Sequence, residues 1–132
     1  MKKIHVVGAV IINEGRVFCT QRGSGALAGY WEFPGGKLEP DESPEDALVR
    51  EIDEELTCTV SVEEKVVTTT HIYDFGEVTL TTFYCALSSG TPTLSEHSDS
   101  RWMHPEELHL LSWAPADVPA VEQVQRDLSD DR

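Results

Sequence analysis

Gly36-Lys37-Leu38-Glu39-Pro40-Asp41-Glu42, then seven residues, then Arg50-Glu51-Ile52-Asp53-Glu54-Glu55 is the stretch that most restricts what this sequence can be. Positions 39–55 hold nine acidic residues and one basic residue, Arg50. The second half of the stretch is predicted to be a helix, because Ser43 is a good N-cap, Pro44 suits the first helical position, and the acids that follow favour the positive end of the helix dipole. We expect this helix to run to about Leu56.

A helical wheel separates the predicted helix into an apolar stripe and an acidic face. At about 100° per residue, the apolar residues gather on one side that we expect to be buried: Leu48, Val49, Ile52 and Leu56. Glu51, Glu54 and Glu55 lie together beside that stripe. Like charges at this spacing destabilise a helix, and either raised pKa values or bound cations would relieve the repulsion. Clustered carboxylate oxygens suit Mg²⁺ or Mn²⁺, whereas the alternative is an acidic face that simply contacts solvent.

The spacing of the stretch resembles the Nudix box, Gly-x5-Glu-x7-Arg-Glu-U-x-Glu-Glu-x-Gly-U, where U is a bulky apolar residue. Every fixed position from Gly36 through Glu42 to the pair Glu54-Glu55 matches. The closing glycine is replaced by Thr57, a β-branched residue that disfavours the left-handed cap conformation of glycine. We therefore expect a reshaped helix end but retained activity, because no metal-facing residue is lost.

The resemblance extends over nearly the whole chain. Four further segments are similar to their counterparts in small MutT-like nucleoside triphosphate pyrophosphohydrolases, and most of all to those that act on CTP: Gln21-Arg22, 31–37, Arg101-Trp102 and 111–117. The resemblance implies an α+β fold, an α/β/α sandwich with a mixed sheet between helices, in a single domain spanning 1–132. The strands, turns and helices expected from local patterns agree with it: strands at 6–12, 16–22, 60–71, 77–87 and 101–104, a helical turn at 105–110 and a helix at 119–128.

The resemblance also implies a reaction. It is Mg²⁺-dependent hydrolysis of a (d)NTP to (d)NMP and pyrophosphate, with Mn²⁺ as a substitute metal, in the sanitation of the nucleotide pool. Two alternatives stay open. One is a Nudix hydrolase of another nucleoside diphosphate derivative such as ADP-ribose, and the other is a non-catalytic module that binds nucleotide.

By resemblance, the metal ligands are Glu51, Glu54, Glu55 and the Gly35 carbonyl. Glu96 in a later loop is expected to be a further metal ligand or the general base, and the alternative is that it is an ordinary exposed loop residue. Glu51 or Glu54 could be the general base instead. Arg50 and Glu42 are expected to anchor the loop to the helix, with Gly36 as a structural residue of the box.

Substrate contacts are expected at Arg22 and Lys37 for phosphate, and at Phe33 and Asp117 for the rest of the nucleotide. An ionised aspartate only accepts hydrogen bonds, so Asp117 favours an exocyclic amine such as cytosine N4. Cytidine-type or oxidised pyrimidine triphosphates are thus the first expectation and oxidised purines the second. The alternative for Asp117 is a helix N-cap. The aromatic candidates to stack on the base, each with a place in the core as its alternative, are Tyr73, Phe75 and Phe83.

Composition sets the remaining limits. The 132 residues carry 10 basic and 24 acidic side chains, a net charge of −14 with a pI near 4.5. This excludes a basic footprint for nucleic acid and disfavours an anionic membrane surface, while divalent cations would still let the protein handle phosphates. No apolar run reaches the roughly 18–20 residues of a membrane span. The three widely spaced cysteines predict buried free thiols in a cytoplasmic protein, present as a monomer or homodimer.

Overall fold

A mixed sheet forms the centre of the computed structural model, which describes residues 1–129. Within these residues the sheet has seven strands: β1 Lys3–Asn13, β2 Arg16–Gln21, β3 Trp31–Glu32, β4 Gly35–Lys37, β5 Thr59–Tyr73, β6 Gly76–Ser89 and β7 Asp99–Met103. The order is β3-β2-β1-β6-β5, with β4 paired to β1 and β7 paired to β2. The β1–β6 pair is parallel and the other pairs are antiparallel, which confirms the predicted mixed sheet.

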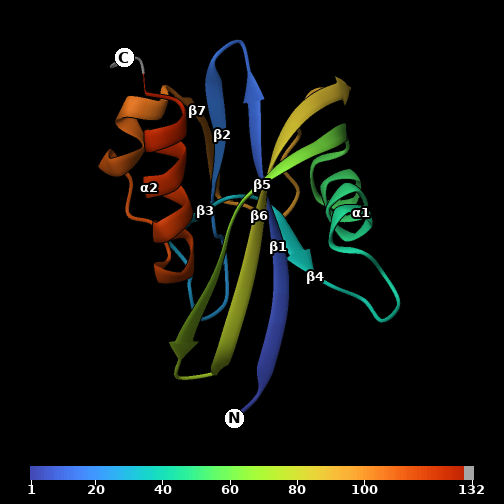
Figure 1. Cartoon of the computed structure of the whole chain (residues 1–132), viewed down its shortest axis with the longest axis vertical. Helices are drawn as coiled ribbons and strands as arrows, with labels where there is room; N and C mark the ends of the chain where they lie inside the picture. The colour runs from blue at the N-terminus through green and yellow to red at the C-terminus, as the bar shows by residue number, and fades with distance from the viewer. Residues whose placement is uncertain (130–132) are drawn as a thin grey trace.

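Two helices lie on opposite sides of this sheet (Figure 1). They are α1 Pro44–Leu56 and α2 Val118–Asp127, and the short 3₁₀ segments η1 Pro105–Leu110 and η2 Pro115–Asp117 precede α2. The α/β/α sandwich expected from the sequence is therefore confirmed. No helix in the described part of the chain is both long and apolar enough to cross a bilayer.

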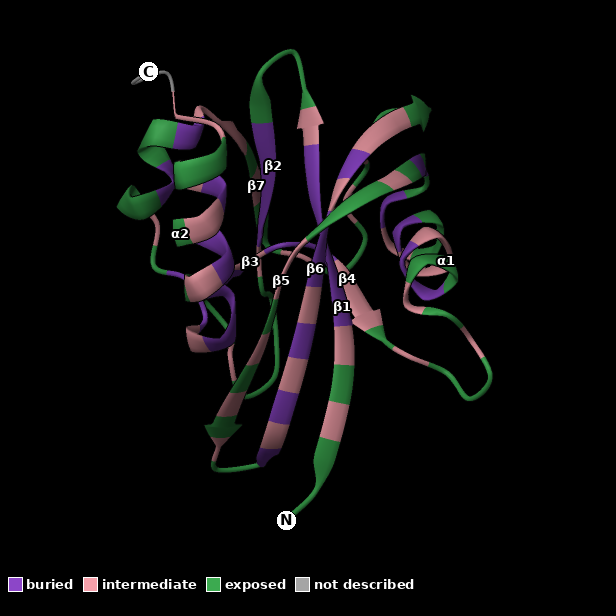
Figure 2. Cartoon of the chain, viewed as in Figure 1, coloured by how far each residue is buried: buried purple, intermediate pink, exposed green. Residues whose placement is uncertain are grey.

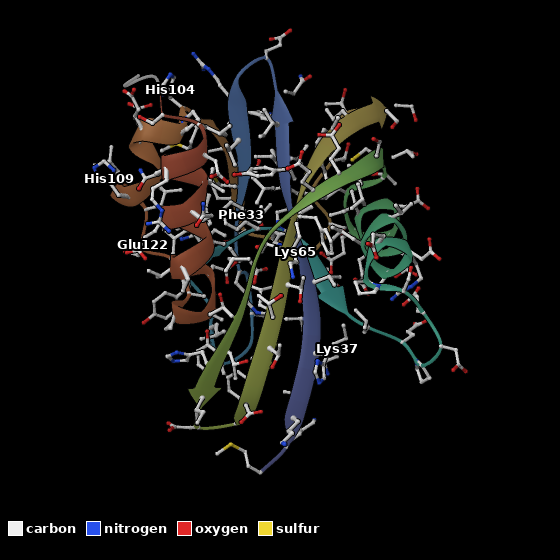
Figure 3. The ribbon with its side chains drawn as sticks, in the orientation of Figure 1. Phe33, Lys37, Lys65, His104, His109 and Glu122 are labelled. Atoms are coloured by element: carbon white, nitrogen blue, oxygen red, sulfur yellow. The ribbon has the colours of Figure 1, made fainter. Side chains whose placement is uncertain are left out.

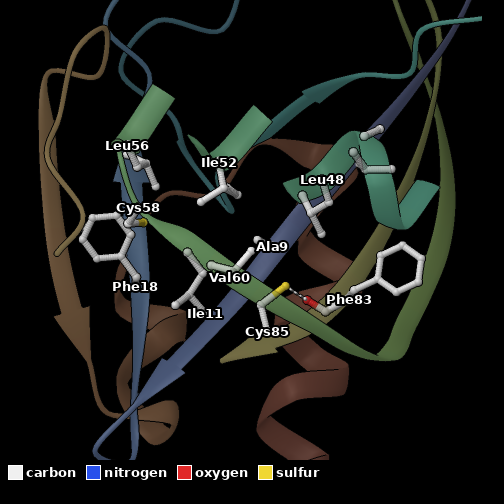
Figure 4. Packing of buried hydrophobic residues seen from close by; sticks show 12 residues of the cluster. Ala9, Ile11, Phe18, Leu48, Ile52, Leu56, Cys58, Val60, Phe83 and Cys85 are labelled. Atoms are coloured by element: carbon white, nitrogen blue, oxygen red, sulfur yellow. Dashed lines mark hydrogen bonds between the residues drawn. The ribbon is translucent and has the colours of Figure 1, made fainter. Parts of the chain in front are cut away.

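The apolar stripe of α1 packs against one face of the sheet (Figure 4). Leu48, Ile52 and Leu56 are fully buried against residues that include Ala9 and Ile11 of β1. Val49, which the wheel placed at the edge of the stripe, is only half-buried, and Ala47 is buried instead. The buried stripe is thus rotated about the helix axis, away from Val49 and towards Ala47, relative to the prediction.

The opposite face of the sheet is covered by α2 and η1. Ala120, Val121 and Val124 of α2 pack with Val10 and Val17 in a second cluster. Figure 2 shows that buried and less buried residues alternate along much of β6. One face of this strand packs in the cluster under α1 and the other against the cluster under α2. The cysteines, Cys19, Cys58 and Cys85, are free and buried, as expected.

Both ends of α1 follow local rules. The Ser43 hydroxyl accepts a hydrogen bond from the Asp46 N–H at 3.1 Å, the predicted N-cap. Thr57 adopts the left-handed conformation, with φ 53° and ψ 38°, and its N–H donates to the Asp53 carbonyl. The prediction of a reshaped helix end was therefore wrong, because the helix keeps the glycine-type cap and threonine bears a strain of roughly 1 kcal/mol.

Candidate functional site

Arg50 ties the loop before α1 to the helix. Its Nε donates to Glu42 Oε2 at 2.7 Å, and its terminal nitrogens donate to Glu42 Oε1 at 3.0 Å and to the Lys37 carbonyl at 3.1 Å. The same guanidinium holds Glu51 Oε1 at 2.8 Å and Glu54 Oε2 at 3.3 Å. The Arg50 hydrogen bond keeps the pKa of Glu42 below its usual range. The arrangement supports the anchoring role that the resemblance implied for Arg50 and Glu42.

Two glycines bring β4 close to both the sheet and α1. Gly35 and Gly36 pair with Gly8 and Val7 of β1. A Cβ on Gly35 would overlap the Val7 carbonyl, and a Cβ on Gly36 would overlap the Glu51 carboxylate. Close approach of backbone therefore requires glycine at position 35, whereas a side chain at position 36 would displace the Glu51 carboxylate, which lies against the backbone of β4.

The glutamates of α1 differ in their surroundings. The side chain of Glu54 is 59% exposed, whereas those of Glu51 and Glu55 are only 15% and 22% exposed. Burial raises the pKa of Glu55 to about 7; His97 opposes this rise, and the charges of Glu51, Glu32 and Glu96 add to it. Glu96 therefore lies within the electrostatic reach of Glu55, although its own loop is exposed.

This group of carboxylates has the donor chemistry of a divalent cation site. Half-buried, mutually repelling carboxylates are stabilised by hard cations such as Mg²⁺. Within residues 1–129, no three acidic, histidine or cysteine side chains already converge as a finished metal site. Arg50 contacts one oxygen of Glu51 and one oxygen of Glu54, so the second oxygen of each carboxylate is not held by Arg50.

A cavity of about 370 Å³ lies beside the carboxylates. Its wall includes all four residues predicted to contact substrate: Arg22, Phe33, Lys37 and Asp117. Figure 3 shows Phe33 near the centre of the molecule and Lys37 further along the cavity wall, by β4. Glu51, Glu54, Glu55 and Glu96 do not line the cavity. Two of them lie next to its wall: Glu51 at Gly36, and Glu55 through His97, which also contacts Glu32.

Asp117 is held in the cavity wall by its backbone neighbours. Residues 112–114 run beside β3, where the Trp31 N–H donates to the Ser112 carbonyl at 2.8 Å and the Ala114 N–H donates to the Trp31 carbonyl at 2.9 Å. This brings Asp117 Oδ2 within 3.0 Å of the Phe33 N–H, which donates to it. Asp117 stands at the N-cap position of α2, as the alternative interpretation had it, but its side chain makes no capping hydrogen bond to the helix.

Burial changes what Asp117 can offer a ligand. The residue is 6% exposed, and this burial raises the pKa of Asp117 to about 8 despite the opposing Phe33 N–H. A raised pKa favours the protonated carboxyl, which both donates and accepts hydrogen bonds. The expectation that Asp117 only accepts hydrogen bonds holds for its ionised form, and the burial that raises its pKa was not visible in the sequence.

Aromatic rings supply the apolar part of the cavity. Tyr73 and Phe75 both line it and stack with centroids 5.0 Å apart and planes 8° apart. The Tyr73 hydroxyl also accepts a hydrogen bond from the Ala116 N–H at 2.9 Å. Phe83 lies instead in the core beneath α1 and does not line the cavity. Two of the three aromatic candidates therefore remain beside the cavity.

Two residues of the site were not singled out from the sequence. Glu32 lines the cavity and accepts a hydrogen bond from Arg22 at 3.3 Å. His97 has a 6% exposed side chain whose Nε2 lies 3.4 Å from Glu32 Oε2 and 3.9 Å from Glu55 Oε2. Their only signal in the sequence is that each directly adjoins a predicted site residue, Phe33 or Glu96.

Comparison with known proteins supports one family. The sequence matches the family model of the NUDIX domain over residues 2–124. It is 40% identical to a CTP pyrophosphohydrolase of Escherichia coli strain K12 over 123 residues, which cover 92% of this chain and 91% of the relative. It is 33% identical to an 8-oxo-dGTP diphosphatase of the same strain over 133 residues, which cover 96% and 99% of the two chains.

Solved structures agree with the sequence comparison. A solution structure of a MutT protein of the Nudix hydrolase family, from methicillin-resistant Staphylococcus aureus 252, matches with a TM-score of 0.80 and 49% identity. The match covers 96% of this chain and 98% of that one. A crystal structure of a MutT NUDIX hydrolase from Burkholderia pseudomallei matches with a TM-score of 0.85 and 28% identity, over 94% and 99% of the two chains.

Proposed function

Since this chain belongs to the NUDIX family of hydrolases, as its acidic stretch predicted, we propose that it is a Mg²⁺-dependent nucleoside triphosphate pyrophosphohydrolase. Water attacks phosphorus, the bridging P–O bond breaks, and the products are the nucleoside monophosphate and pyrophosphate. The observation that carries the proposal is the contact between the glutamate face of α1 and the cavity wall at Gly36 and Glu32.

The glutamate face is the proposed metal site. Its ligands are Glu51, Glu54, Glu55 and the Gly35 carbonyl, with Glu96 reaching in from the loop before β7. When bound, Mg²⁺, or Mn²⁺ in its place, neutralises phosphate charge and lowers the pKa of coordinated water. This is how a chain of net charge −14 tolerates an anionic substrate. Glu54 is the most exposed of the α1 ligands, which suits it to receive a proton from water, with Glu51 and Glu96 as the alternative bases.

The cavity is the proposed nucleotide site. Arg22 and Lys37 contribute positive charge to its wall for the phosphates. Phe33, Tyr73 and Phe75 provide apolar surface for the base. Asp117 Oδ2 accepts the hydrogen bond from the Phe33 N–H, so we assign Oδ1 to the hydrogen bond with the nucleotide base.

The substrate we propose is a cytidine-type or oxidised nucleoside triphosphate. The relative that is 40% identical is named a CTP pyrophosphohydrolase and the one that is 33% identical an 8-oxo-dGTP diphosphatase. When protonated, Asp117 offers a hydrogen-bond donor to a carbonyl or ring nitrogen of the base; when ionised, it offers an acceptor to an exocyclic amine. Cytidine-type and oxidised bases both carry groups of these kinds.

The test is a turnover screen with Mg²⁺ over ordinary and oxidised NTPs and dNTPs, run beside ADP-ribose. Ion-exchange chromatography identifies the products, so pyrophosphate and phosphate are distinguished. We expect (d)NMP and pyrophosphate, with the highest kcat/KM for a cytidine-type or oxidised nucleotide. Cleavage of ADP-ribose alone would favour the other Nudix reaction, and binding without turnover of any compound would favour the non-catalytic module.

A further inference from the structure

His97 is a buried histidine in an otherwise exposed loop. It lies between β6 and β7, and its side chain is 6% exposed although Glu96 and Ser98 on either side are exposed. Its Nε2 faces two carboxylates, Glu32 from β3 and Glu55 from α1. Its Nδ1 is buried with no hydrogen-bond partner among residues 1–129. A buried polar atom without a partner is costly, so the position of this ring needs a reason.

The backbone on both sides of His97 is fixed. The Ser95 hydroxyl donates to the Glu55 carbonyl at 2.8 Å, which ties the loop to the end of α1. The Ser98 N–H donates to the Gln21 carbonyl at 3.0 Å, which ties the loop to β2. These two anchors hold the imidazole in the gap between α1 and β3.

The partners of His97 decide which nitrogen carries hydrogen. Both neighbours of Nε2 are carboxyl oxygens, and an ionised Glu32 only accepts hydrogen bonds, so a hydrogen on Nε2 suits this contact. Glu32 is held on its other side by Arg22, whose terminal nitrogen donates to Oε1 at 3.3 Å. The side chains therefore form a chain from Arg22 through Glu32 and His97 to Glu55, from the cavity wall to the glutamate face.

We propose that His97 is a positioning residue that holds the Glu55 carboxylate in place for the divalent cation, with Glu32 as its fixed second contact. The inference rests on the proposed function, because it assigns Glu55 to the metal. Without His97, the half-buried Glu55 is left facing Glu32 and Glu96, and like charges push it out of place. Groups that orient a metal ligand typically change metal affinity 10–100-fold.

The test measures Mn²⁺ affinity directly, from the electron paramagnetic resonance signal of free Mn²⁺, without substrate or turnover. We compare the wild type with His97→Ala, His97→Gln and His97→Asn. The Gln amide nitrogen lies near the position of Nε2, whereas the shorter Asn side chain cannot reach Glu55. We expect binding about 10-fold or more weaker for Ala and Asn, and within about 3-fold of the wild type for Gln.

His109→Gln is the matched control, because His109 is an exposed histidine on η1, on the α2 side of the molecule (Figure 3). It should bind Mn²⁺ as the wild type does. Thermal unfolding in metal-free buffer checks that each variant is folded; if Ala does not fold, the Gln and Asn pair decides. If the wild type binds Mn²⁺ and turns over nucleotide, and every His97 variant binds Mn²⁺ as tightly as the wild type, the inference about His97 is overturned and the proposed function is not. A wild type that binds no Mn²⁺ overturns the proposed function with it.

Discussion

Glu55 and Asp117 are both carboxyl groups with raised pKa values, yet they belong to elements on opposite sides of the sheet and have opposite surroundings. Glu55 is half-buried and stands among Glu51, Glu32 and Glu96, with the His97 imidazole beside it. Asp117 is almost fully buried and hydrogen-bonds a backbone N–H. Crowded negative charge is relieved by a cation, whereas a deeply buried carboxyl with few charged neighbours is relieved by protonation. The difference is the basis for proposing metal chemistry in the first region and base recognition in the second.

The largest effect is expected on the glutamate face. Glu54→Gln should lower kcat/KM by about 10³-fold or more, because loss of a proposed metal ligand or base removes several kcal/mol of transition-state stabilisation. Steady-state pyrophosphate release measures the loss. The fold should survive, because Glu54 is mostly exposed. Glu122→Gln, an exposed glutamate on α2, should leave turnover unchanged. Substantial turnover in the Glu54 variant would remove this residue from the chemistry.

The second region should affect recognition and leave metal binding unchanged. Asp117→Ala is expected to lower kcat/KM for the preferred nucleotide by about 10–100-fold, mainly through KM, because a buried hydrogen-bonding partner of the base is lost. Mn²⁺ affinity should stay as in the wild type. A fall in metal affinity comparable to the loss in kcat/KM would show that the two regions are not separate.

Stability should change with pH through Asp117. Its pKa is raised from 3.8 to about 8 on folding, so between these values the folded state binds the proton and the unfolded state does not. This contribution to stability is therefore lost as pH rises through that window. Asp117→Asn keeps an acceptor for the Phe33 N–H but does not titrate. From pH 5 to pH 8 the variant should gain about 2–4 kcal/mol relative to the wild type, measured by urea unfolding. A difference that does not vary with pH would show that Asp117 is ionised in the folded protein.

The smallest effect is expected at the end of α1. Thr57→Gly should stabilise the protein by about 0.5–1 kcal/mol, because glycine adopts the left-handed cap without the strain of a β-branched residue, and its higher unfolded entropy offsets part of the gain. Urea unfolding measures the change, and kcat/KM should not move. Destabilisation would mean that the Thr57 side chain contributes a contact that outweighs its strain.

Local rules predicted the frame of the site well. Ser43, Pro44 and the apolar stripe located α1 to within a residue, since caps and helical period act within a few residues. The resemblance to the Nudix box implied the anchoring by Arg50 and Glu42, and these two side chains are hydrogen-bonded. What local patterns could not supply is the environment of each side chain. The raised pKa of Asp117, the burial of Phe83 away from the cavity, and the placement of His97 between two carboxylates all result from contacts between segments far apart in the sequence.

The most direct measurement of the central claim is Mn²⁺ binding by the wild type and by a Glu51→Gln/Glu55→Gln double variant, each with and without the nucleoside monophosphate product. The account predicts that the wild type binds Mn²⁺, that the nucleotide tightens this binding through reciprocal coupling, and that the double variant loses both effects while staying folded. Equal Mn²⁺ binding by the two proteins would contradict it.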